Sequence, residues 1–272
     1  MSIIYGFLRG ILSVFSLLTP LSYSGHDSLF RYLSFDLKTG GYDSILPLIV
    51  KLAVIISISY FLKKDLISLF KSTGSLLKNN KENTKSHPLP LMVFAGGLVM
   101  LLMLPLKILF KGISDYIIIA AVGFILSAVF VISSLKVKEK NLKESNESIL
   151  NGMVVAFFNV LSCIPGISGF GGMYYAGLIS GFRREFAVKF AYILILLWAV
   201  CSFIYEIIFG FVTGFIINFD ILYYIFFALG AIGISGASIF AVSKALQNKK
   251  TMLFAFYNIA ISIITLLIMI RG

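Results

Sequence analysis

Two short polar segments interrupt this otherwise apolar chain, and each begins at a proline. The first runs from Pro20 to His26 and the second from Pro165 to Gly172. Serine hydroxyls, backbone amides turned outward by glycine and helix N-termini together suit a bound phosphate. A glycine-rich turn in a membrane protein also lets helices pack closely, and the residues alone favour neither reading.

His26 is the one histidine in an apolar context, and Asp27 follows it directly. An ionisable group at membrane depth is a functional hypothesis by default. The alternative is a neutral imidazole bonded to a backbone carbonyl. Before Pro20, Arg9 and Ser13 lie on one face of a helix, at spacing i and i+4. We therefore expect a polar cavity lined by residues of both segments: Arg9, Ser13, Ser22, Ser24, His26, Asp27, Asn159 and Ser168.

The composition requires that these segments be positioned within a bilayer. Of 272 residues, 59% are hydrophobic and 13% are charged, where a soluble domain carries roughly 25% charged residues. The formal net charge of +11 does not indicate nucleic-acid binding, because the lysines cluster in the gaps between apolar runs. That distribution is typical of cytoplasmic loops under the positive-inside rule.

Six apolar runs come close to the ~20 residues that a spanning helix needs. They are 45–62, 90–111, 115–135, 190–210, 221–243 and 251–270. The polar stretch 72–87 is expected to be a loop. Each proline segment lies in a region too short to cross and return, so we predict two re-entrant hairpins, 3–35 and 149–182, bent at Pro20 and Pro165.

The predicted fold is an all-α polytopic membrane protein forming a single domain, 1–272. Each half contains a hairpin and three spans, and three is an odd number, so residues 149–272 are inverted relative to 1–135. Inverted repeats with broken helices that meet near the membrane centre are typical of transporters. The alternative is a plain bundle of eight helices in which both proline segments are incidental kinks.

The motifs resemble those of the undecaprenyl-diphosphate phosphatase family, also known as bacitracin-resistance proteins. The end of the family's first motif, Pro-x-Ser-Ser-Thr-Gly-His, is matched at Pro20, Ser22, Gly25 and His26, with Ser24 replacing threonine. The second motif, Pro-Gly-x-Ser-Arg-Ser-Gly, is matched at Pro165, Gly166, Ser168 and Gly171. The likeness continues through 176–187 and 254–257, and covers nearly the whole length.

The chain departs from the family at four charged or polar positions. Ser13 and Leu17 stand where the family has two glutamates, Gly169 replaces the motif arginine, and Phe170 replaces the serine after it. The resemblance implies a divalent cation, Mg²⁺ or Ca²⁺, but hard cations need oxygen ligands that this chain does not supply at the motif positions. Asp27 and Arg9 are candidates to compensate for the missing carboxylates and the missing arginine.

The resemblance implies a phosphatase that hydrolyses undecaprenyl (polyprenyl) diphosphate to the monophosphate and inorganic phosphate, recycling the lipid carrier of cell-wall synthesis. It implies a multi-pass protein of the bacterial plasma membrane, with the lipid and the bilayer as partners and a homodimer as a further option. The expected catalytic residues are His26, Ser22, Ser24 and Asp27. The expected substrate-binding residues are Arg9, Ser13, Asn159, Ser168, Gly166 and Gly171.

Two other functions stay open because of the four departures. A relative that has lost catalysis would bind or translocate a polyprenyl phosphate in the same cavity. A secondary transporter for a small anion would rest on the architecture alone. Release of phosphate by the purified protein separates the enzyme from both.

Overall fold

The computed structural model describes residues 3–33, 43–77, 89–103, 105–106, 116–138 and 148–271. These residues form helices and no strands, as the sequence predicts. The first half contains α1 (Ile3–Leu17), α2 (Tyr23–Leu33), α3 (Ile45–Phe61), α4 (Lys63–Leu77), α5 (Leu89–Leu101) and α7 (Ile117–Lys136). The second contains α8 (Ile149–Val160), the 3₁₀ turn η3 (Leu161–Cys163), α9 (Gly169–Ile179), α10 (Arg184–Thr213), α11 (Ile221–Gln247) and α12 (Met252–Arg271).

Both proline segments break the helix where the sequence places the breaks. Proline lacks an N–H and cannot continue a helix, so α1 ends before Pro20 and η3 ends before Pro165. A serine then caps the next helix. The Ser22 hydroxyl accepts the Gly25 N–H at 3.1 Å, and the Ser168 hydroxyl accepts the Gly171 N–H at 3.0 Å. Each segment therefore ends one helix and starts another.

Several of the helices are suited to a bilayer, which makes this a multi-pass membrane protein. Among the described residues, α7, α10, α11 and α12 are long and apolar enough to cross alone. Helices α3 and α4 add a fifth span if they count as one, although they meet at a bend of 81°. Helices α1, α5 and α8 are apolar but shorter. The prediction of six spans and two re-entrant hairpins therefore stays a prediction.

Three boundaries differ from the sequence prediction. Residues 72–77, expected to be a loop, form the end of α4, because Leu66 and Leu69 recur at helical spacing and pack on the core. Helix α10 begins at Arg184, six residues before the predicted start at 190. Helix α5 ends at Leu101, and most of the remainder of the predicted span 90–111 lies outside the described residues.

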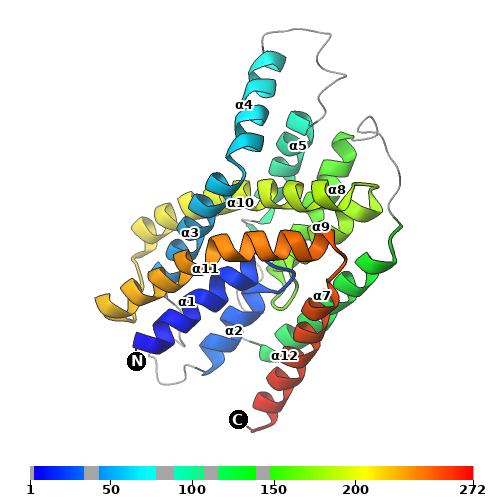
Figure 1. The fold of residues 1–272 in the computed structure, drawn as a ribbon. Coiled ribbons are helices and arrows are strands. Elements are labelled where there is room, and N and C mark those ends of the chain that lie inside the picture. The colour runs from blue at the N-terminus through cyan, green and yellow to red at the C-terminus, as the bar shows by residue number, and fades with distance from the viewer. Residues whose placement is uncertain are drawn as a thin grey trace.

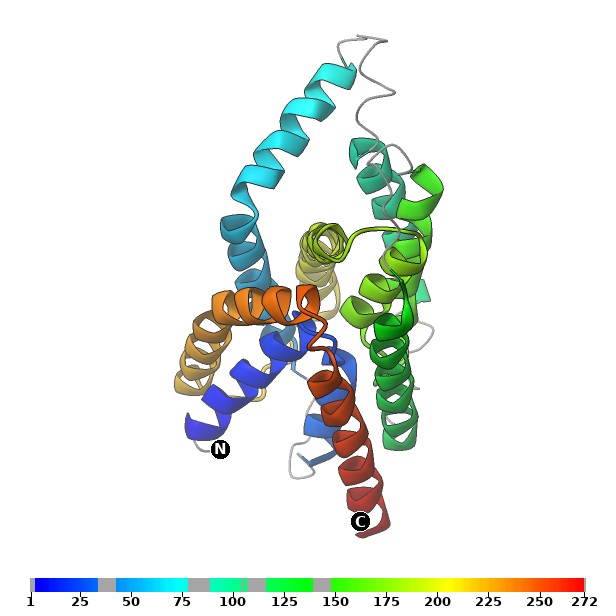
Figure 2. The same cartoon turned by 45° about the vertical axis from the view of Figure 1, so that its right-hand side comes forward.

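Segments far apart in the sequence lie side by side (Figures 1 and 2). Helix α1 packs on α11, α5 on α8, and α7 on α12, while α3 contacts both α10 and α11. The α1–α11 contact is close enough to exclude side chains. A Cβ on Gly230 would overlap the carbonyl oxygen of Phe7, and one on Gly10 would overlap that of Phe227. Small residues permit such close backbone approach in membrane proteins.

Gly230→Ala is expected to destabilise the protein by about 2 kcal/mol, because the new methyl group must separate α1 from α11. Gly233→Ala is the matched control, since it lies one turn away on the same helix with nothing within 4 Å of the added Cβ. Thermal unfolding in detergent measures both. Equal transition temperatures for the two variants would contradict the close contact.

Candidate active site at the two hairpin tips

The two proline segments, which we call the hairpin tips, are joined by reciprocal hydrogen bonds. Ser22 donates to the carbonyl of Ile167 at 3.1 Å, and Ser168 donates to the carbonyl of Thr19 at 3.4 Å. The hydroxyl of Ser24 donates to the carbonyl of Ser162 at 3.2 Å. Residues about 140 positions apart in the sequence therefore form one structural unit.

Side chains of α7 and α12 hold the tips from outside. Ser127 of α7 donates to the Gly166 carbonyl at 2.8 Å and accepts the Ser168 N–H at 2.7 Å. Asn258 of α12 donates to the Pro20 carbonyl at 2.9 Å. Gly166 has a φ of +87°, a left-handed conformation that favours glycine. The backbone of both tips is therefore fixed by side chains from the helix pair α7 and α12.

His26 is the last residue of the first tip and is 3% exposed. Its Nδ1 is 2.6 Å from the Ser22 carbonyl and its Nε2 is 2.8 Å from the Tyr257 hydroxyl. The imidazole stacks on the Tyr257 ring, with centroids 5.7 Å apart, and the Phe124 ring meets it edge-on at 5.2 Å. The backbone-carbonyl contact expected of a merely structural histidine is present, together with a second polar partner, Tyr257, that the sequence motifs do not predict.

The electrostatics of the tips suit an anion. Helices α2 and α9 both begin there, and a helix N-terminus carries roughly half a positive charge. Ser22 and Ser168 are fully buried and use their hydroxyls to cap and join the tips, whereas Ser24 is partly exposed. Of the three serines, Ser24 has the hydroxyl most accessible to a ligand.

Arg9 and Asp27 form a separate group on the α1 side of α2. The Arg9 guanidinium is 3.6 Å from the Asp27 carboxylate, which also pairs with Arg31 at 3.3 Å. Arg9 is 3% exposed and lies over the rings of Phe30 and Phe219 at 5.2 and 5.8 Å. The described side-chain polar contacts of Asp27 are thus with arginines, and those of His26 are with Ser22 and Tyr257. The adjacent positions of Asp27 and His26 in the sequence do not make them a dyad.

Asn159 occupies space beside the position of the family's motif arginine. Its amide donates to the sulfur atoms of Met100 and Met103 at 3.2 and 3.1 Å. A Cβ added at Gly169 would overlap its carboxamide oxygen. Phe170, which replaces the motif serine, is buried against Tyr192 with ring centroids 4.8 Å apart. Packing thus fills the space at both replaced positions.

Gly169→Arg is expected to destabilise the protein by about 2 kcal/mol, because the arginine stem meets the Asn159 carboxamide. The double variant Gly169→Arg with Asn159→Ala should recover at least about 1 kcal/mol relative to the sum of the single changes. Thermal unfolding of the four proteins gives this coupling energy. If the destabilisation of the double variant equals the sum of the two single effects, the Asn159 side chain does not restrict the size of the residue at position 169.

The remaining predicted residues lie close to these groups. Ser13 is buried on α1, where its carbonyl accepts the Ser16 hydroxyl at 3.1 Å. Gly171 donates its N–H to Ser168 in the α9 cap. No group of three His, Cys, Asp or Glu side chains that could hold a metal ion occurs among the described residues, and the divalent cation implied by the resemblance stays a prediction. Both nitrogens of His26 already have polar partners, so we derive no step through a metal.

An ion pair that the motifs did not predict joins two apolar helices. Lys51 of α3 pairs with Glu206 of α10 and is 2% exposed. Its ammonium group also lies 5.8 Å from the centre of the Trp198 ring. Glu206 lies in the second half of α10. Each is the only charged residue in its predicted span, 45–62 or 190–210, a signal that could have identified the pair.

Two further buried polar residues are structural. Arg184 is 3% exposed and donates to the Tyr174 hydroxyl at 2.8 Å and to the Ser134 carbonyl at 3.2 Å. Asp43 accepts the Ile45 N–H at 2.7 Å at the start of α3, and also the Tyr224 hydroxyl at 2.6 Å. Both therefore tie helix ends together.

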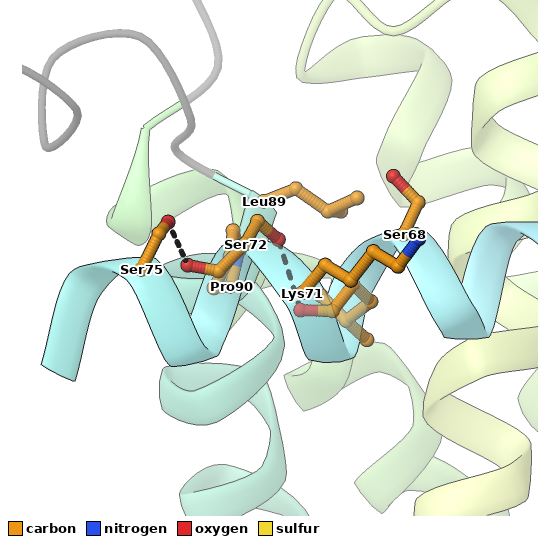
Figure 3. Close-up of a pocket in the computed structure, with 7 residues that line it drawn as sticks. Ser68, Lys71, Ser72, Ser75, Leu89 and Pro90 are labelled. Atoms are coloured by element: carbon orange, nitrogen blue, oxygen red, sulfur yellow. Dashed lines mark hydrogen bonds between the residues drawn. The ribbon is translucent and has the colours of Figure 1, made fainter. Parts of the chain in front are cut away.

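A hollow of about 330 Å³ lies away from the tips, between α4 and the start of α5 (Figure 3). Its serines include Ser72 and Ser75, whose hydroxyls donate to carbonyls of their own helix at 2.9 and 2.7 Å. None of the predicted site residues lines it. The tips therefore remain the candidate site.

Comparison with known proteins agrees with the motifs at the tips. The family model described as bacitracin resistance protein BacA matches residues 2–264. The undecaprenyl-diphosphatase of Thermosipho melanesiensis is 28% identical over 267 residues, which cover 97% of this chain and 96% of that protein. The one from Methanococcus vannielii is 28% identical over 188 residues, 69% of this chain and 72% of its own length. That of Buchnera aphidicola is 26% identical over 268 residues, 96% of this chain and 94% of its own.

Proposed function

Since this chain belongs to the bacitracin resistance protein BacA family, we propose that it hydrolyses undecaprenyl (polyprenyl) diphosphate to the monophosphate and inorganic phosphate. The similar proteins named undecaprenyl-diphosphatase support this assignment. The observation that carries the proposal is the meeting of two helix N-termini and a buried histidine at the hairpin tips. The reaction would recycle the lipid carrier of cell-wall synthesis in the bacterial plasma membrane.

The membrane arrangement that fits this function is the predicted inverted repeat. We infer six spans, with α1–α2 and α8–α9 as re-entrant hairpins that enter from opposite faces. The first helix of each hairpin packs on a helix of the other half, which supports this arrangement. Helix α1 packs on α11, and α8 packs on α5. The tips would then meet within the membrane, and the lipid tail would lie between helices.

In the proposed reaction, water attacks the terminal phosphorus and the bridging P–O bond breaks. The lipid monophosphate leaves with the bridging oxygen, and the proton of the attacking water passes to His26 as the acid/base group. The N-termini of α2 and α9, with the Ser24 hydroxyl, would bind the terminal phosphate. Ser22, Ser168, Gly166 and Gly171 would shape the tips, and Arg9 would hold the remaining negative charge of the headgroup.

The direct test is release of inorganic phosphate from a short-chain polyprenyl diphosphate by the protein purified in detergent. Release is measured with and without added Mg²⁺ or Ca²⁺, because the cofactor stays a prediction. Release above a protein-free control supports the phosphatase. Arg9→Ala is expected to weaken substrate binding, because Arg9 and Arg31 share the single negative charge of Asp27 and so leave a net positive charge for the headgroup.

The second candidate is a binder or translocator of polyprenyl phosphates that has lost catalysis. It is favoured by the filled space at positions 169 and 170, where packing replaces an arginine and a serine. Binding of the lipid diphosphate without phosphate release under any metal condition would support this candidate. Transfer of the lipid between leaflets of a vesicle would then separate a translocator from a binder.

A further inference from the structure

Tyr257 gives His26 a polar partner on α12, the last helix of the chain. The Tyr257 hydroxyl is 2.8 Å from Nε2, and the two rings stack with an interplanar angle of 20°. His26 is 3% exposed, whereas Tyr257 is partly exposed. Tyr257 is therefore the more accessible member of the pair.

The hydrogen bonds determine which imidazole nitrogen carries the hydrogen. The Ser22 carbonyl, 2.6 Å from Nδ1, can only accept, so Nδ1 must be the donor. In the neutral imidazole, Nε2 then accepts the hydrogen of the Tyr257 hydroxyl. The bond at one ring nitrogen commonly fixes the state of the other. The lone pair of Nε2 is thus directed at the Tyr257 hydroxyl.

We propose that Tyr257 positions the His26 ring, whose Nδ1–H is fixed by the Ser22 carbonyl, and connects Nε2 to the ligand side as a proton relay. A proton accepted by His26 then moves from the Tyr257 hydroxyl to Nε2, while the phenol oxygen takes the proton of the attacking water. No proton is lost or gained in this exchange. The role in catalysis rests on the proposed phosphatase function, whereas the tautomer does not.

Nitrogen NMR of the histidine side chains tests the pair without requiring activity. The chain has two histidines, so His87→Gln identifies the signals of His26. We expect a protonated Nδ1 and an unprotonated Nε2 whose resonance shifts in Tyr257→Phe. Tyr60→Phe is the matched control, because Tyr60 is 74% exposed and its expected effect on His26 is nil. A protonated Nε2 in the neutral wild type, or an unchanged resonance in Tyr257→Phe, would overturn the proposal.

Phosphate release then tests the catalytic consequence. Tyr257→Phe is expected to lower kcat at least about ten-fold with KM changed less than about two-fold, because the reacting state loses one hydrogen bond and the proton relay. An unchanged kcat would overturn the catalytic part. If the wild type releases no phosphate, the proposed function fails, while the NMR result still decides whether Tyr257 positions His26.

Discussion

Replacing His26 with alanine is expected to lower phosphate release at least about 100-fold, the usual contribution of a positioned acid/base group. The imidazole is the buried acid/base group at the tips, and its neutral form can accept a proton. Substrate binding should change much less, because the helix N-termini and Arg9 remain. Release from a short-chain polyprenyl diphosphate and binding of the same lipid measure the two effects separately.

Loss of packing could mimic loss of chemistry in this variant, because His26 also contacts Phe124 and Tyr257. His26→Gln fills more of the space and can still hydrogen bond, so it should fold normally and release as little phosphate as the alanine variant. His87→Ala is the control for histidine content and should retain full activity. A glutamine variant with near wild-type release would show that His26 is structural.

The helix breaks could be predicted because they depend on local chemistry. Proline removes a backbone donor and serine supplies a helix cap, so Pro20 with Ser22 and Pro165 with Ser168 each mark an end and a start. The meeting of the tips followed from their matching places in the two halves. Their anchoring by Ser127 and Asn258 could not be predicted, because single serines and asparagines in long apolar helices give no signal of their partners.

The composition of the site was harder to predict than its location. Asp27 and His26 are neighbours in the sequence, but successive helical positions differ by about 100° in direction, which places Asp27 toward Arg9 and His26 toward Tyr257. Asn159 looked like a ligand-binding amide, and its contact with Gly169 depends on how α8 lies against α9. Such contacts are set by tertiary packing and are not encoded in motif spacing.

Lys51→Met is expected to destabilise the protein by about 3–5 kcal/mol, the cost of leaving a buried partner charge uncompensated. Lys51 of α3 and Glu206 of α10 come from different halves of the chain, and Ser202 lies 3.5 Å from the second carboxylate oxygen of Glu206. The Glu206 side chain is 25% exposed, so partial access to solvent places the effect toward the lower end. Thermal unfolding in detergent, with chemical denaturation for the free energy, measures the loss.

A double variant separates the charge pair from simple packing. Lys51→Met with Glu206→Leu replaces both charges by apolar groups, so it should recover most of the stability lost in Lys51→Met. The pair of Lys189 and Asp65 is the control, because both side chains are 40% exposed and Asp65→Asn should cost less than about 1 kcal/mol. A double variant as unstable as the sum of its parts would mean that α3 and α10 are joined by the shape of these side chains and not by their charges.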